Sequence, residues 1–136
     1  MDDNYSILLT DDEPDIRRAL KRSLHVPGYT MHEAGDGVEA LELLKTTPCH
    51  AIISDFNMPR MNGLDLLTQV RIMYPNMLRI LLTARADVHL AVRALNEGAV
   101  HRFLLKPWDH VDLKGIVRMA LHSMQTQDLP PRGGKD

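Results

Sequence analysis

Acidic, hydroxyl and amino side chains stand at the ends of four short apolar segments in this 136-residue chain. The segments and their polar residues are Ser6–Thr10 with Asp11, Asp12 and Glu13, Ala51–Ser54 with Asp55, Arg79–Thr83 with Thr83 itself, and His101–Leu105 with Lys106. Clustered carboxylates repel one another and need a cation nearby; an all-oxygen set suits a hard cation, which we expect to be Mg2+. A carboxylate held by a metal and a lysine can attack phosphorus, because phosphoryl transfer needs mainly positioning and neutralised charge. The residue types therefore predict a Mg2+-assisted phosphoryl-acceptor site, with Thr83 placed to donate a hydrogen bond to a phosphoryl oxygen.

These segments belong to a regular alternation of strands and helices. Tyr29–Ala34 completes the set of predicted strands, which recur at intervals of roughly 20 to 28 residues. The stretches between them carry apolar residues at helical spacing, as in Ile16, Ala19, Leu20 and Leu24. Strands alternating with helices predict right-handed βαβ units, and hence a doubly wound α/β fold with a parallel sheet covered on both faces. Since ligands bind beyond the carboxyl ends of such strands, the polar residues should meet at one edge.

Residues that favour helix ends support this division of the chain. Pro14 suits a first helical turn, Gly98 a helix C-terminus, and Asp109 the N-cap of the last helix. The periodic pattern fades near residue 126. We therefore expect one domain over residues 1–126, with 127–136 as a flexible tail or the start of a linker.

Composition excludes several classes of protein. The net charge of -2 argues against a nucleic-acid surface, and the single Cys49 excludes an intrachain disulfide framework. No apolar run reaches the roughly 18 residues that a membrane span needs, and the acidic MDDNY lacks the basic and apolar stretches typical of a signal peptide. We expect a cytoplasmic domain that binds neither nucleic acid nor membrane.

Four motifs, taken in order, resemble a known family. LLTDDEPDIR, IISDFNMPRMNGLDLL, ILLTA and FLLKPWD are similar to the receiver domain of bacterial two-component response regulators, over about residues 4 to 124. The resemblance implies a flavodoxin-like fold like that of the chemotaxis regulator, with strand order 2-1-3-4-5. It also implies a signalling switch rather than an enzyme, beyond self-phosphorylation and slow self-dephosphorylation. Its phosphodonor would be a sensor histidine kinase or a phosphotransfer protein.

The same resemblance assigns a role to each matching position. Asp55 is the phosphoacceptor, and Asp12 and Asp55 bind Mg2+ directly. Asp11 reaches the metal through water, and the backbone carbonyl of Asn57 completes the ligands. The remaining assignments are Thr83 as the switch hydroxyl, Lys106 as the phosphate-binding lysine, Phe103 as the switch aromatic, and Pro107 as the second residue of a cis peptide.

The resemblance also implies a readout face and partners. The face would comprise the fourth helix, fifth strand and fifth helix, about Val88 to Met124, and would contact an output domain, a target protein or a second copy. In the fourth helix, apolar Val88, Leu90, Ala91 and Leu95 exceed one buried stripe. NEGAVHRFLLKPWD is similar to receivers that precede regulatory output domains, including HD-type phosphodiesterases. Both a stand-alone signalling protein and a piece of a longer regulator fit the sequence.

Simpler interpretations and other functions remain open for some of these residues. Asp11, Asp12 and Glu13 would also favour a helix N-terminus, and Phe103 would also serve as a core aromatic. A phosphohydrolase with an aspartyl nucleophile would want a second aspartate where Asn57 stands. A flavin-binding flavodoxin-like domain would want a hydroxyl- and glycine-rich loop in place of the first acidic group. The histidines lack metal-ligand spacing and are interpreted as surface or structural residues.

Overall fold

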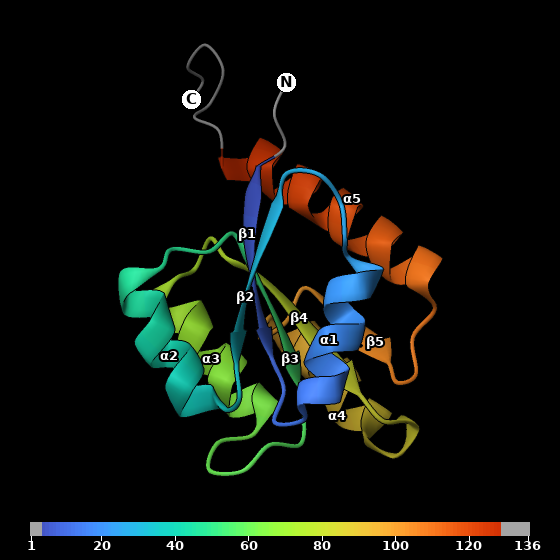
Figure 1. Cartoon of the computed structure of the whole chain (residues 1–136). Helices are drawn as coiled ribbons and strands as arrows, with labels where there is room; N and C mark the ends of the chain where they lie inside the picture. The colour runs from blue at the N-terminus through green and yellow to red at the C-terminus, as the bar shows by residue number, and fades with distance from the viewer. Residues whose placement is uncertain (1–3, 129–136) are drawn as a thin grey trace.

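The computed structural model describes residues 4–128, and its helices and strands alternate as predicted (Figure 1). The strands are β1 (Tyr5–Thr10), β2 (Tyr29–Ala34), β3 (Ala51–Asp55), β4 (Leu78–Thr83) and β5 (Arg102–Leu105). The helices are α1 (Pro14–Ser23), α2 (Gly37–Thr46), α3 (Gly63–Met73), α4 (Val88–Glu97) and α5 (His110–Asp128), with a short 3-10 turn, η1, over Arg85–Asp87. The predicted strand boundaries differ from these by at most one residue.

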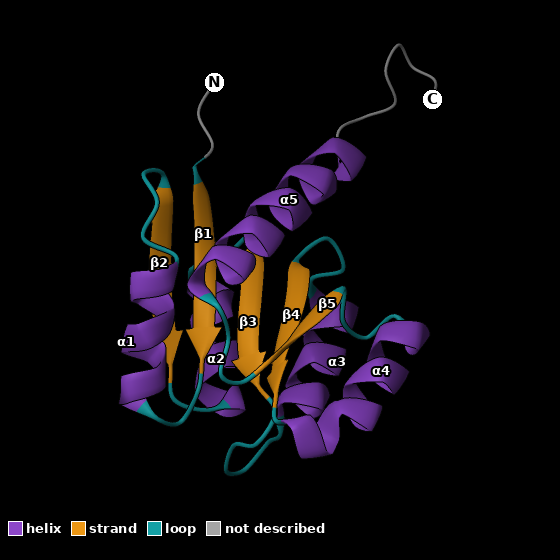
Figure 2. Cartoon of the chain, turned by 90° about the vertical axis from the view of Figure 1, so that its right-hand side faces the viewer, coloured by secondary structure: helices purple, strands orange, loops and turns teal. Residues whose placement is uncertain are grey.

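The strands form one parallel sheet in the order β2-β1-β3-β4-β5, which confirms the predicted fold class. The helices lie on both faces of the sheet: the apolar residues of α1 and α5 pack on one face, and those of α2, α3 and α4 on the other (Figure 2). Because all strands run the same way, their carboxyl ends gather at a single edge of the sheet.

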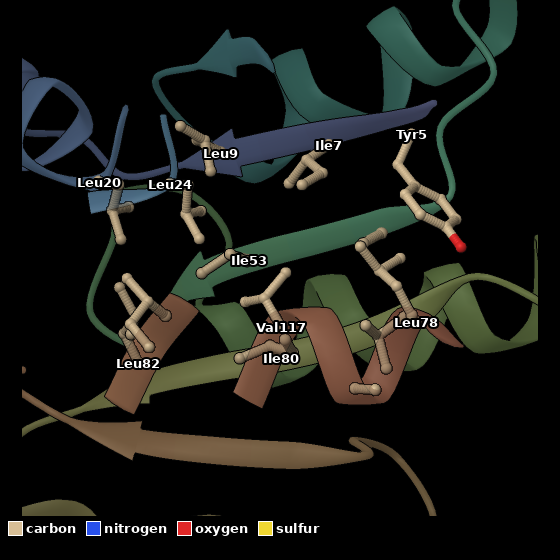
Figure 3. Packing of buried hydrophobic residues seen from close by; sticks show 14 residues of the cluster. Tyr5, Ile7, Leu9, Leu20, Leu24, Ile53, Leu78, Ile80, Leu82 and Val117 are labelled. Atoms are coloured by element: carbon tan, nitrogen blue, oxygen red, sulfur yellow. The ribbon is translucent and has the colours of Figure 1, made fainter. Parts of the chain in front are cut away.

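Apolar side chains on both faces of the central strands hold these layers together. Along β1, Ile7 and Leu9 face α1 and α5, as Figure 3 shows, whereas Leu8 faces the other helices. All three are fully buried. Each contributes about 1.5–3 kcal/mol relative to an exposed position.

The predicted helix ends are also present. Asp109 accepts a hydrogen bond from the third backbone N–H of α5 at 3.0 Å, and Gly98 ends α4 with a φ of 84°, a region that favours glycine. Pro14 is the first residue of α1. Helix α5 continues to Asp128, two residues past the predicted domain boundary. The rest of the predicted tail, 129–136, lies outside the described residues.

Within residues 4–128, no helix combines the length and the apolar composition that crossing a bilayer would require.

Two histidines extend the sheet at its amino edge, the edge at which the strands begin. The imidazole Nδ1 of His50 accepts the backbone N–H of Ser6 at 3.0 Å, and the His50 N–H donates back to the Ser6 carbonyl at 2.8 Å. His101 makes the same pair of bonds with Arg79, at 3.0 and 2.8 Å. Each histidine therefore adds one rung between neighbouring strands. An Nδ1 that accepts a hydrogen bond belongs to a neutral imidazole, so both rungs require the uncharged ring.

The side chain of Arg79 closes the same edge. Arg79 is 4% exposed, and the structure gives its guanidinium no carboxylate partner among the described residues. Instead the guanidinium donates to four backbone carbonyls in two loops, those of Pro75, Met77, Gly98 and Ala99. Burial, with the nearby charge of Arg71, lowers the pKa of Arg79. Burial and the charge of Arg79, followed by Arg102 and Arg71, lower the pKa of His101 to about 4.

Candidate functional site

The three predicted carboxylates meet at the opposite, carboxyl edge of the sheet. Asp55 is the last residue of β3 and is 5% exposed, while Asp11 directly follows β1 and is fully buried. Asp12, the next residue, is exposed. One oxygen from each carboxylate lies within 4.8 Å of the others. Two strands that are neighbours in the sheet thus bring together residues that are 44 positions apart in the chain.

Asp11 lies in an electrostatically unfavourable environment. Its Oδ1 accepts the backbone N–H of Glu13 at 2.9 Å, but its buried Oδ2 has no hydrogen-bond partner. Burial raises the pKa of Asp11 to about 6; the Glu13 N–H opposes this shift, and the nearby Asp55 charge adds to it. An unpartnered, buried carboxylate oxygen is costly in an isolated fold, and a cation would provide the missing partner.

Lys106 supplies a cation at this site. It follows β5, and its Nζ lies 2.9 Å from Asp55 Oδ1 and 3.8 Å from Asp11 Oδ2. Burial lowers the pKa of Lys106, but the hydrogen bond and charge of Asp55 outweigh this, and the pKa is raised overall. The backbone N–H of Lys106 donates to the Thr83 carbonyl at 2.9 Å, and this bond attaches the loop that begins at Lys106, called here the lysine loop, to β4. The peptide bond from Lys106 to Pro107 is cis, as the resemblance implied.

The loop after Asp55 explains why the sequence contains Asn-Gly at positions 62 and 63. A Cβ on Gly63 would lie 2.1 Å from the carbonyl oxygen of Asp55, so only glycine fits there. Asn62 caps α3 by accepting the N–H of Asp65 at 2.8 Å. The exposed side chain of Asn57 donates to Asp87 at 3.5 Å. The turn thus folds back tightly on the end of β3, and the metal-binding role of the Asn57 carbonyl stays a prediction.

Thr83 and Phe103 occupy neighbouring strands beside this cluster. Thr83 ends β4, is 1% exposed, and donates from its hydroxyl to the Ala84 carbonyl at 3.2 Å. Phe103 pairs in register with Leu81 on β4; its half-buried ring packs against the apolar cluster formed with α2, α3 and α4. The switch roles of both residues stay predictions. Phe103 already serves as a core aromatic in this conformation.

Arg17 is a member of the site that the sequence reasoning missed. From α1, its Nη1 donates to the backbone carbonyl of Asp11 at 2.5 Å, and its Nε donates to Glu33 on β2 at 2.9 Å. Hydrogen bonds from Lys21 and Arg17 lower the pKa of Glu33. Arg17 therefore fixes the backbone that carries the buried acid. The sequence feature that could have identified it is a basic residue one helical turn past the start of the helix that follows the acidic group.

Three of the four apolar residues that the sequence analysis singled out in α4 are at least half-buried, although Val92 of the same helix is 42% exposed. Ala91 is buried, Val88 and Leu90 are half-buried, and only Leu95, at 38%, is exposed among the four. Part of the apparent excess of apolar surface therefore belongs to the core.

Taken together, the residues at this edge fit a divalent cation. Three carboxylates face one ammonium group, so the cluster carries excess negative charge. Its ligand atoms are all oxygens, and one of them is buried without a hydrogen-bond partner. Hard cations such as Mg2+ prefer this donor set.

Comparison with known proteins assigns the chain to a family. The family model described as the response regulator receiver domain matches residues 7–118. The chain belongs to this family. Receiver domains are signalling domains of two-component response regulators, and the sequence resemblance is thereby confirmed.

Individual relatives support this assignment. The receiver chain is 37% identical over 122 residues to response regulator MprA of Mycobacterium ulcerans, covering 90% of this chain and 52% of the relative. It is 35% identical over 124 residues to the DNA-binding transcriptional regulator NtrC of Escherichia coli K12, covering 91% of this chain and 26% of the relative. The chain thus spans about half and about a quarter of these two curated relatives.

A solved structure resembles this receiver along most of both chains. The signal receiver domain of an HD domain-containing protein from Pseudomonas fluorescens Pf-5 is 37% identical and superposes with a TM-score of 0.84. The match covers 90% of this chain and 98% of the other.

Proposed function

We propose that Asp55 accepts a phosphoryl group from a sensor histidine kinase or a phosphotransfer protein when Mg2+ is bound. The observation that carries this proposal is the position of Lys106 Nζ, 2.9 Å from Asp55 Oδ1, beside three clustered carboxylates. A carboxylate oxygen of Asp55 attacks phosphorus, the P–N bond of the donor breaks, and the histidine nitrogen takes a proton from solvent. The product is an acyl phosphate on a rigid strand end.

Each neighbouring residue has a distinct part in this reaction. Asp12 and Asp55 would bind Mg2+ directly, with Asp11 acting through water and the Asn57 carbonyl as a further ligand. The bound metal would neutralise charge on the phosphoryl oxygens. Lys106 would leave its ion pair with the free carboxylate and bind a phosphoryl oxygen. Arg17 keeps the Asp11 backbone in place.

The signal would leave through α4, β5 and α5. Thr83 would turn toward the phosphoryl group, and Phe103 would move into the space it leaves. A complete swing of such a two-state equilibrium needs about 5.5 kcal/mol of differential stabilisation. We infer that the reader of this face is an output domain or a target protein in the cytoplasm. NtrC is named as DNA-binding, but the net charge of -2 in the present chain favours no direct contact with nucleic acid.

The reaction can be tested by intact mass after incubation with acetyl phosphate or phosphoramidate. We expect one added phosphoryl group with Mg2+, none with EDTA, and none in Asp55→Asn. Asp12→Ala should weaken Mg2+ binding strongly because it removes a direct ligand. Thr83→Ala should still accept the phosphoryl group while losing output. A phosphoryl group that remains on Asp55→Asn would place the acceptor elsewhere and refute the proposal.

A further inference from the structure

The buried hydroxyl of Ser23 joins three elements that lie far apart in the chain. Ser23 is the last residue of α1 and is 2% exposed. Its Oγ accepts the indole N–H of Trp108 at 2.8 Å and lies in hydrogen-bonding contact with Nδ1 of His110, the first residue of α5. These partners follow Ser23 by 85 and 87 residues, so the contacts depend on the way α1 and α5 pack against each other.

The hydrogen-bonding capacity of the three groups sets the direction of these bonds. An indole N–H can only donate, so the Ser23 oxygen must accept from Trp108. The hydroxyl hydrogen remains available, and we assign it to Nδ1 of His110, which accepts in the neutral ring. The bond to His110 orients the hydroxyl so that a lone pair of the oxygen faces the indole. Ser23 therefore provides a fixed acceptor for Trp108.

The lysine loop is attached to the fold on both sides of Pro107. On one side, Lys106 donates its backbone N–H to the Thr83 carbonyl on β4 at 2.9 Å. On the other side, the Trp108 side chain is bound to the last residue of α1. The ring of Pro107 fixes φ between these two bonds. The backbone of Lys106 therefore has little freedom while both bonds are present.

Helix α1 thereby holds both halves of the candidate site. Near its start, Arg17 donates to the carbonyl of Asp11 at 2.5 Å, and at its end Ser23 holds Trp108. One helix of ten residues thus connects the buried acid to the loop that carries Lys106. Side chains held on a helix are positioned more accurately than side chains held only by a loop.

We propose that Ser23 is a positioning residue for phosphoryl transfer: through Trp108, it holds the backbone of Lys106 where the ammonium group can reach a phosphoryl oxygen on Asp55. This role rests on the proposed function. Lys106 Nζ already lies 2.9 Å from Asp55 Oδ1, so the positive charge stands close to the place where negative charge arrives. Without the Ser23 hydroxyl, the loop also adopts positions in which Lys106 is out of reach, and transfer slows.

The rate of phosphoryl gain from phosphoramidate with Mg2+, followed by intact mass, tests this role. Ser23→Ala should slow the reaction about fivefold, a factor within the range that one hydrogen bond produces. Trp108→Phe keeps an aromatic ring without the N–H and should slow it by a similar factor. The double variant should be about as slow as either single variant, because both changes remove the same bond. Trp108→Phe leaves the buried hydroxyl in place, so it carries the test if Ser23→Ala does not fold.

A second cycle separates positioning from a purely structural role. In a Lys106→Ala background, Ser23→Ala or Trp108→Phe should cause no further slowing, because the group that they position is gone. A hydroxyl that only stabilises the fold would slow the reaction by the same factor in both backgrounds. That result would overturn the proposal, and so would an unchanged rate for both variants when Lys106 is present.

The ion pair of the unphosphorylated chain tests the same role without phosphoryl transfer. Urea denaturation in EDTA gives the coupling between Lys106→Ala and Asp55→Asn, and this coupling should fall by about half in Ser23→Ala. An unchanged coupling would overturn the positioning role. If wild type gains no phosphoryl group on Asp55, the proposed function fails, and the coupling alone decides the role of Ser23. The two failures are therefore distinguishable.

Discussion

The two edges of the sheet bury polar groups in opposite ways. At the amino edge, the guanidinium of Arg79 donates to four backbone carbonyls, and His101 accepts a backbone N–H. At the carboxyl edge, Asp11 Oδ2 is buried without a hydrogen-bond partner, and Asp55 shares a single ammonium group with it. The buried polar groups of the amino edge find hydrogen-bond partners within the chain, whereas the carboxyl edge carries excess negative charge.

The difference separates groups that stabilise the fold from groups kept for a ligand. A buried polar group with all its partners lowers the free energy of the native state relative to the same group unpaired. A buried carboxylate oxygen without a hydrogen-bond partner raises this free energy, and a ligand from outside the chain would offset that cost. The contrast predicts that removing polar groups at the two edges changes stability with opposite signs.

Arg79→Met should produce the largest loss. It removes the donors to four backbone carbonyls in two loops, so we expect the free energy of unfolding to fall by about 4 kcal/mol, measured by urea denaturation. Arg79→Lys is the matched control; it keeps the charge but not the fork of donors, and should lose roughly half as much. Equal stability of Arg79→Met and wild type would show that the hydrogen bonds of Arg79 do not stabilise the amino edge.

His101 should make the amino edge sensitive to acid. Its pKa is about 4 in the folded chain and 6.5 in the unfolded chain, so between these values the unfolded state binds more protons. The contribution of neutral His101 to the free energy of unfolding is therefore fully present above pH 6.5 and is lost as the pH falls toward 4. The difference between the two pKa values corresponds to a loss of at most about 3 kcal/mol of unfolding free energy.

His101→Asn is the control for this pH dependence, since its side-chain oxygen can still accept the Arg79 N–H without titrating. Urea denaturation between pH 7 and 4.5 should show wild type losing about 2 kcal/mol more than the variant. Parallel pH profiles for the two proteins would show that His101 does not carry the acid sensitivity.

Asp11→Asn should act in the opposite direction at the other edge. The amide can still accept the Glu13 N–H, but it removes a buried charge, so without Mg2+ at pH 7.5 the variant should be about 1–2 kcal/mol more stable. Thermal unfolding with EDTA measures this. Excess Mg2+ should stabilise wild type more than the variant. Destabilisation of Asp11→Asn in EDTA would abolish the contrast between the edges.

The sequence predicts the carboxyl edge better than the amino edge for a physical reason. Asp55, Thr83 and Lys106 occupy strand ends, and parallel strands bring their ends together whatever the details of packing. Periodicity places the strands within one residue, so the convergence follows from the chain order alone.

Contacts at the amino edge depend on tertiary geometry that periodicity does not contain. Arg79 was assigned to a strand, but its carbonyl partners lie in loops up to 20 residues away. His50 and His101 were interpreted only as surface or structural residues, yet each completes a rung with a neighbouring strand. The bond from Arg17 to the Asp11 carbonyl was missed for the same reason, since it depends on how α1 packs.

The smallest effect should be optical, and it concerns the single tryptophan. Trp108 lies two residues after Lys106, and its indole N–H donates to the buried Ser23 hydroxyl at 2.8 Å, which anchors the lysine loop to the end of α1. When Lys106 moves from Asp55 onto a phosphoryl oxygen, this loop should adjust and change the packing or solvation of the indole. We therefore expect a modest change in emission on adding beryllofluoride with Mg2+.

The change should be absent in Asp55→Asn and reduced in Lys106→Ala. Ser23→Ala is a matched variant that frees the indole N–H without touching the acidic cluster, and the looser ring should enlarge the response. An unchanged emission in protein shown by mass to be phosphorylated would mean that the Ser23 anchor holds the loop still, and Trp108 would not report on the site. An emission change that persisted in Asp55→Asn would be more serious. It would place the ligand away from the carboxyl edge and contradict the conclusion that this edge is kept for a ligand.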